Sequence, residues 1–183
     1  MKNNILSTLF VGIDVSSKTN VLCALDFEGN KLLNLKALNN QPGAESILDS
    51  IIVCLDSNSL EYVVIALEST SFYSTHIANF LASNELLLAY NPLVYCLNPK
   101  TTANYRKTFV DMDKTDPLDA YVIADFARCG KITSKPWRGS QFLALQRLTR
   151  HRLHLIENIT REKTYMVSNI YLKFSQLAVL ETI

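Results

Sequence analysis

The order of short apolar segments along the first 90 residues constrains the fold most strongly. Three segments rich in β-forming residues follow one another with only short turns between them, at residues 9–15, 20–26 and 31–38. Connections this short join antiparallel strands, so we expect these segments to form a meander. The sequence then predicts a helix, a strand, a helix and a strand in turn, over residues 44–55, 60–67, about 72–83 and 86–90.

This order of elements predicts a mixed α/β fold of the ribonuclease-H-like type, with helices flanking the sheet. An antiparallel meander followed by parallel crossover units has that topology. The segment 60–67 is almost entirely apolar, which is typical of a strand buried on both faces. By analogy with the fold, Asp14 in the first strand and Glu68 after the fourth would lie on adjacent central strands, at the edge where ligands gather.

Asp14 is a candidate functional residue because a charged side chain inside a buried strand is costly unless it is paired or binds a cation. Its alternative role is to cap the turn that follows. Asp116 and Asp119 raise the same question. Asp116 precedes Pro117 and would begin a helix that ends near Gly130, and Asp119 would lie on the same side of the first turn. The two acids either cap the helix and complement its dipole, or form half of a Mg²⁺ site.

Four carboxylates from separate elements thus stand out, and together they favour one or two Mg²⁺ ions, with Mn²⁺ as a substitute. A cluster of like charges would otherwise raise its own pKa values and destabilise the fold. We therefore expect these residues to be both catalytic and metal-binding: Asp14, Glu68, Asp116 and Asp119.

Two basic stretches are candidates for contact with nucleic acid. Residues 91–110 are interrupted by prolines and mix aromatic with basic side chains, which suits either a nucleic-acid contact or a solvated loop. Residues 140–183 show apolar positions every three or four residues and predict a long helix that pairs as a coiled coil or helical hairpin. The basic residues of the two stretches are Lys100, Arg106 and Lys107, then Arg147, Arg150, Arg152, Arg161 and Lys163. Those on the helix would form a phosphate-binding or a solvated face.

The expected domain organisation is a catalytic domain over residues 1–130, a linker over 131–139 and a helical oligomerisation segment over 140–183. The chain has 183 residues and a net charge of +1, so nucleic-acid binding would depend on local patches. No apolar run approaches the length of a membrane span, no signal peptide is evident, and no two cysteines form a C-x-x-C pair. We therefore expect a cytoplasmic protein without a membrane partner.

Five stretches of the sequence resemble a known family. They are Gly12–Lys18, Leu67–Tyr73, Asn98–Pro99, Lys114–Ala120 and Leu145–Arg152. In this order they resemble the DEDD insertion-sequence transposases with a RuvC-like catalytic domain, which are the bridge-RNA-guided recombinases. One departure is Ser69-Thr70 after Glu68, where the family often has a proline-containing turn.

The resemblance implies that Asp14, Glu68, Asp116 and Asp119 are the DEDD quartet, which binds Mg²⁺ for DNA strand cleavage and exchange. It also implies DNA and a guide RNA as partners, with specificity largely in RNA pairing. Dimers or higher homo-oligomers would assemble through the long helix. The family's C-terminal domain carries a nucleophilic serine, and we expect the chain to end before that domain.

Two other functions remain open at this point. A non-catalytic fragment for nucleic-acid binding or oligomerisation would use the same acids structurally. An actin-like ATPase or sugar kinase also opens with a strand containing Gly-Ile-Asp, but needs glycine-rich phosphate loops. The chain has five glycines and none of them forms a G-x-G pair, which argues against the kinase.

Overall fold

A computed structural model describes residues 4–69, 72–109 and 116–176; for Asp116 it describes the backbone alone. It divides into two compact units, Met1–Gly139 and Ser140–Ile183, which are described separately. The elements are η1 Ile5–Ser7, β1 Thr8–Val15, β2 Thr19–Leu25, β3 Lys31–Leu38, α1 Gln41–Ser57, β4 Tyr62–Glu68, α2 Tyr73–Ser83, α3 Glu85–Leu88, β5 Leu93–Leu97, α4 Pro99–Arg106, α5 Asp116–Arg128 and α6 Ser140–Lys173.

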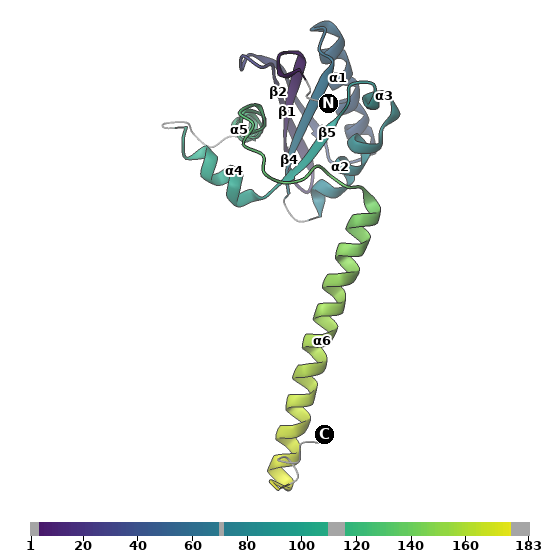
Figure 1. Cartoon of the computed structure of the whole chain (residues 1–183), viewed down its shortest axis with the longest axis vertical. Coiled ribbons are helices and arrows are strands. Elements are labelled where there is room, and N and C mark those ends of the chain that lie inside the picture. The colour runs from purple at the N-terminus through teal and green to yellow at the C-terminus, as the bar shows by residue number, and fades with distance from the viewer. Residues whose placement is uncertain (1–3, 70–71, 110–115, 177–183) are drawn as a thin grey trace. The chain divides into compact units, whose positions relative to one another are not determined.

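The first unit is built on one five-stranded sheet with the order β3-β2-β1-β4-β5. β2 pairs antiparallel with β1 and with β3, whereas β4 runs parallel to both β1 and β5. An antiparallel meander extended by parallel strands confirms the predicted ribonuclease-H-like arrangement. Figure 1 shows α1, α2 and α3 on one side of this sheet and α4 and α5 on the other.

β1 is apolar on both faces because helices cover both faces of the sheet. Leu9, Val11, Ile13 and Val15 point into a core shared with α1 and α2. Phe10 points the other way and packs with Ile123 and Phe126 of α5. Two-sided burial therefore explains the apolar composition, and Asp14 belongs to the face that α5 covers.

Gly12 allows α5 to lie directly against the sheet. A Cβ atom at this position would lie 2.3 Å from both the carbonyl oxygen of Ala120 and the backbone nitrogen of Ala124. A side chain there would require α5 to move away from β1. The backbone contact at Gly12 thus fixes how close the first turns of α5 come to β1.

The fifth strand was predicted wrongly at residues 86–90. Residues Glu85–Leu88 form α3, which the Asn84 side chain caps by accepting a hydrogen bond from the Leu86 backbone N–H, 3.0 Å away. β5 instead lies at Leu93–Leu97, inside the stretch that was expected to be an irregular basic region. That stretch also contains α4, so it is mostly structured.

Residues 131–139 run back along the first unit. The Trp137 backbone N–H donates to the Val94 carbonyl at 2.7 Å, and its indole N–H donates to the Asn79 amide oxygen at 2.8 Å. These two bonds attach the segment to β5 and to α2. The predicted linker is therefore held against the sheet-containing unit in its second half.

The second unit contains α6, a helix of 34 residues, which corresponds to about 50 Å at the usual rise per residue. None of its side chains is buried in this single chain. Its exposed apolar side chains include Phe142, Leu145, Leu148, Leu153, Ile156 and Ile159. Among the described residues, no helix combines the length and apolar character needed to cross a membrane.

Candidate active site

Two of the four predicted acids lie on neighbouring strands at one edge of the sheet. The parallel pairing of β1 and β4 places Gly12 beside Ala66 and Ile13 beside Leu67. The next residue of each strand is Asp14 and Glu68, so the two carboxyl groups extend from adjacent strand ends on the same face. Both residues are half-buried. The adjacency inferred from the fold analogy is thus present in the structure.

α5 brings a third acid to this edge. Its close packing on β1 at Gly12 places the first turn of the helix near Asp14. A pocket of about 360 Å³ is lined by Asp14, Glu68 and Asp119. Thr102 and Arg106 of α4 complete its polar lining, and the remaining lining residues are Pro99, Ala103, Val122 and Ile123.

Asp116, the fourth predicted acid, is the first residue of α5. Its side chain lies outside the described residues, as do residues 110–115 before it. The structure therefore brings three members of the quartet to one pocket and places the backbone of the fourth one helical turn before Asp119.

Thr102 orients the Glu68 carboxylate. Its hydroxyl lies 2.7 Å from Oε2 of Glu68 and 3.0 Å from the carbonyl oxygen of Pro99. Thr102 is buried, so its bond to Glu68 is shielded from water and holds the carboxylate in a defined position.

Arg106 supplies the positive charge of the pocket. Its guanidinium forms an ion pair and hydrogen bond with Oδ1 of Asp119. The two side chains are 23% and 21% exposed, so the pair is screened less than one on the open surface. Arg106 thus partly neutralises a group of acids that would otherwise repel one another.

The pocket contains the oxygen donors of a hard-cation site, but among the described residues their side chains are not arranged as a complete set of metal ligands. Within residues 4–69, 72–109 and 116–176, no group of three or more His, Cys, Asp and Glu side chains is placed to hold a metal ion. Carboxylate oxygens are nevertheless the donors that Mg²⁺ prefers. Asp14, Glu68 and Asp119 could hold it once Arg106 releases Asp119.

Sequence reasoning missed the part that α4 plays in this pocket. Thr102 was not singled out, and Arg106 was expected to contact nucleic acid rather than Asp119. Asn98 caps α4 by accepting from the Lys100 backbone N–H at 2.9 Å, and Pro99 begins the helix. This cap and proline could have predicted the helix, on which Thr102 and Arg106 lie four residues apart and share a face.

A second network fastens α4 to α5. The Tyr105 hydroxyl donates to Asp125 at 2.7 Å, and Arg128 donates to the other oxygen of that carboxylate at 2.7 and 2.9 Å. Burial, with the nearby Cys129 and Asp125, raises the pKa of Tyr105 well above its usual value, so the hydroxyl stays a donor. This network keeps α4 beside the acidic pocket.

The remaining predicted basic residues lie on exposed surface. Lys100 and Lys107 are exposed at the two ends of α4. The other five are exposed along α6: Arg147, Arg150, Arg152, Arg161 and Lys163. Their roles are unchanged as predictions.

The chain was compared with known proteins. The family model of the IS110-type DEDD transposases, described as a transposase, matches residues 11–173. The chain is similar to Thermus thermophilus RuvC in complex with a Holliday junction substrate, at 16% identity and a TM-score of 0.43, over 71% of this chain and 99% of that one. A second structure of RuvC from Thermus thermophilus gives 15% identity and the same TM-score, over 70% and 99% of the two chains. No curated protein matches significantly. Because the family model covers most of its length, the chain belongs to the IS110-type DEDD transposase family.

Proposed function

We propose that this chain carries the metal-dependent catalytic site of a DNA transposase or recombinase. Asp14, Glu68, Asp116 and Asp119 would hold one or two Mg²⁺ ions for DNA strand cleavage and exchange, and Mn²⁺ would substitute. The observation that carries the proposal is the meeting of Asp14, Glu68 and Asp119 in one pocket, although they come from two strands and a helix.

The residues of the pocket divide the work. Bound Mg²⁺ would stabilise the negative charge that develops on a phosphodiester under attack. Asp14 and Glu68 provide fixed oxygen donors because they project from strands buried on both faces. Thr102 limits the rotation of Glu68 through its 2.7 Å hydrogen bond. Arg106, which is paired with Asp119 in the absence of metal, would release Asp119 as a metal ligand and would then be available to a phosphate oxygen.

The proposed partners are DNA, a guide RNA and further copies of the chain. Lys100 and Lys107 are exposed at the two ends of the helix that lines the pocket, where a DNA backbone would pass. The proposal of a guide RNA as a partner is based on the family resemblance alone. The basic residues of α6 would contact phosphates, and replacing Arg147, Arg150 and Arg152 with Gln should then flatten the salt dependence of DNA or RNA binding. An unchanged slope would identify them as solvated surface.

Calorimetric titration with Mn²⁺ or Mg²⁺ tests the metal site. We expect the intact chain to bind the ion and the double variant Asp116→Asn with Asp119→Asn to lose that binding, because half of the donor set would no longer be charged. Asp49→Asn on the exposed surface of α1 is the matched control and should bind as the unaltered chain does.

The titration is repeated in the presence of a DNA strand, because phosphate oxygens commonly complete a Mg²⁺ site. Binding that appears only with DNA and disappears in the double variant supports the proposal. Equal binding by the unaltered chain and the double variant would contradict it, as would no binding under either condition. The acids would then be structural, and the chain would be non-catalytic.

A further inference from the structure

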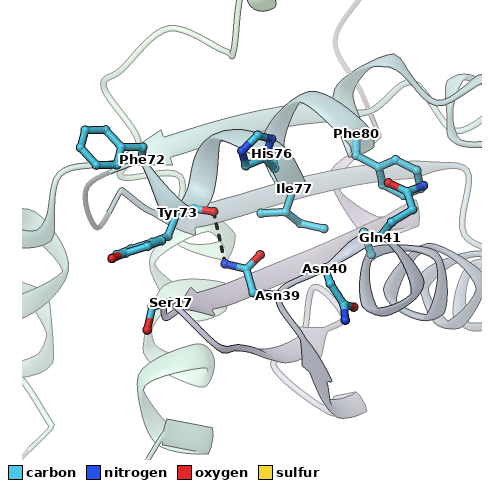
Figure 2. A pocket seen from close by; sticks show the side chains of 10 residues that line it. Ser17, Asn39, Asn40, Gln41, Phe72, Tyr73, His76, Ile77 and Phe80 are labelled. Atoms are coloured by element: carbon cyan, nitrogen blue, oxygen red, sulfur yellow. Dashed lines mark hydrogen bonds between the residues drawn. The ribbon is translucent and has the colours of Figure 1, made fainter.

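A second pocket opens at the same end of the sheet as the acidic pocket, but on the face that α1 and α2 cover. It has a volume of about 530 Å³, within the range of small-molecule sites. Figure 2 shows residues of α2 along one side and residues that follow β1 and β3 along the other. The lining residues are Ser17, Asn39, Asn40, Gln41, Ala44, Phe72, Tyr73, His76, Ile77 and Phe80.

Asn39 holds the walls of this pocket together. Its side-chain N–H donates to the Ser16 carbonyl at 2.8 Å and to the Tyr73 carbonyl at 3.4 Å, the second bond being drawn in Figure 2. Its amide oxygen accepts from the buried Asn20 at 3.3 Å. One side chain therefore ties together the turn after β1, the start of β2 and the start of α2, so the pocket is formed before a ligand arrives.

The pocket presents flat aromatic surface beside an apolar floor. Tyr73 is 44% exposed, and its ring meets that of Phe72 edge-on with 6.5 Å between centroids. Ile77 is buried below, and Phe80 is half-buried at the far end. Exposed aromatic rings over an apolar floor are suited to stacking against a planar ligand.

The charge of the lining restricts the ligand further. None of the ten lining residues is Lys, Arg, Asp or Glu, so the pocket offers no permanently charged partner to a phosphate or a metal ion. The polar groups are instead hydroxyls, amides and an imidazole, which exchange hydrogen bonds with neutral donors and acceptors. A planar, neutral group with an apolar face and a polar edge has the chemistry of a nucleobase.

The two pockets are also adjacent along the chain. Asp14 lines the acidic pocket and Ser17 lines the second one, so their Cα atoms lie at most about 11 Å apart even if the chain is fully extended. Glu68, which lines the acidic pocket, and Tyr73, which lines the second pocket, are likewise only five residues apart in the sequence. A nucleotide whose phosphate enters the acidic pocket could therefore place a nearby base in the second pocket.

We propose that this second pocket binds one unpaired base of the DNA strand whose phosphate lies at the acidic pocket. The inference rests on the proposed function, because it assumes that DNA is cleaved at that site. The pocket would hold the base by stacking on Tyr73 and would fix the position of the strand. The protein would then select DNA that is unpaired beside the scissile bond.

The experiment uses the full chain and short single-stranded DNA containing one fluorescent 2-aminopurine. Its fluorescence should be quenched when the base stacks on Tyr73. Tyr73→Leu keeps an apolar side chain but removes the ring; it should abolish the quenching and weaken binding about tenfold, whereas Tyr73→Phe should retain both. Phe27→Ala, an exposed aromatic at the turn between β2 and β3, is the matched control and should behave as the unaltered chain does.

Two further strands separate the outcomes. One is a DNA strand with an abasic position in place of the fluorescent base. The unaltered chain should bind this abasic strand about tenfold more weakly than the intact strand. Tyr73→Leu and the unaltered chain should bind the abasic strand with equal affinity. Equal binding of the intact and abasic strands by the unaltered chain would overturn the base pocket. The same sequence made as RNA should show weaker quenching; equal or stronger quenching would reject DNA as the source of the base.

The metal titration distinguishes failure of the base pocket from failure of the proposed function. Loss of base selectivity with metal binding intact overturns the pocket alone. If the unaltered chain binds no metal with or without DNA and also fails to bind DNA, both the base pocket and the proposed function are overturned.

Discussion

The hydrogen bond from Thr102 to Glu68 allows the organisation of the acidic pocket to be tested at a single atom. Thr102→Val keeps the shape of a buried side chain and removes the hydroxyl that lies 2.7 Å from the carboxylate. We expect Mn²⁺ affinity to fall about tenfold, the lower end of the effect seen when a partner of a metal ligand is removed. Calorimetric titration measures the change.

Thr102→Ser is the conservative control, since it restores the hydroxyl and should recover most of the metal affinity. The melting temperatures of the two metal-free variants should be similar, although their metal affinities differ. Equal loss of affinity in both variants would show that the hydroxyl, which Thr102→Ser retains, is not what supports metal binding at this position.

Arg106 provides a second test, because it occupies Asp119 in the absence of metal. Arg106→Met removes the charge but keeps much of the aliphatic stem. We expect the metal-free chain to lose about 1 kcal/mol of stability, as for a partly exposed ion pair. Added Mn²⁺ should then stabilise Arg106→Met more than it stabilises the unaltered chain, because no side chain competes for Asp119.

The comparison needs a control for simple loss of a positive charge. Lys107→Met, one residue further along and exposed, serves that purpose and should leave the metal-dependent gain in melting temperature unchanged. A gain in Arg106→Met no larger than that in Lys107→Met would show that Arg106 does not compete with the metal.

At the scale of the elements, the position of α5 on β1 determines where Asp119 lies. Gly12→Ala places a methyl group where the α5 backbone lies 2.3 Å away, so the helix must shift. We expect a loss of about 2 kcal/mol or more in stability together with loss of metal binding, because overpacking here displaces a ligand. Chemical unfolding and the metal titration measure the two effects.

Ile13→Val is the control from the same strand. Ile13 points to the opposite face, into the core with α1 and α2. This variant should lose about 1 kcal/mol of stability and retain metal binding. If Gly12→Ala bound metal as well as Ile13→Val did, the contact between β1 and α5 would not set the geometry of the pocket.

The elements also show which parts of the structure were accessible from the sequence. The strands of the meander and β4 were predictable because apolar runs and short turns act locally. β5 was not, because Leu93–Leu97 follows a proline and lies in a basic stretch, and its identity as a strand depends on parallel pairing with β4. A leucine-rich run at 86–88 competed for the assignment, but Asn84 caps it as a helix.

The candidate site, like the fold, was predictable from the sequence only in part. Asp14 and Glu68 stood out as charges at the ends of apolar strands, and their adjacency followed from a fold analogy. The ion pair between Arg106 and Asp119 joins residues 13 positions apart across α4 and α5. No periodicity within either segment encodes that contact, so sequence reasoning assigned Arg106 to nucleic acid instead.

For the whole molecule, the exposed apolar side chains of α6 require an explanation. Leu145, Leu148, Ile156 and Ile159 are each between 43% and 66% exposed and recur at spacings of three, eight and three residues along the helix. Large apolar side chains repeated on one helix are usually covered by another helix. We propose that a second copy of α6 covers them.

Comparing the intact chain with a variant that lacks residues 140–183 tests this proposal. We expect the intact protein to associate with increasing concentration in sedimentation experiments and Met1–Gly139 to stay monomeric, because the five-stranded sheet and its two apolar layers lie within the first unit. Ile156→Glu with Ile159→Glu should also prevent association, since the introduced charges would be buried in the interface. Arg161→Gln, away from the apolar positions, should leave association unchanged. An intact chain that remains monomeric at every concentration would leave the apolar side chains of α6 to a different partner and would exclude self-association through this helix.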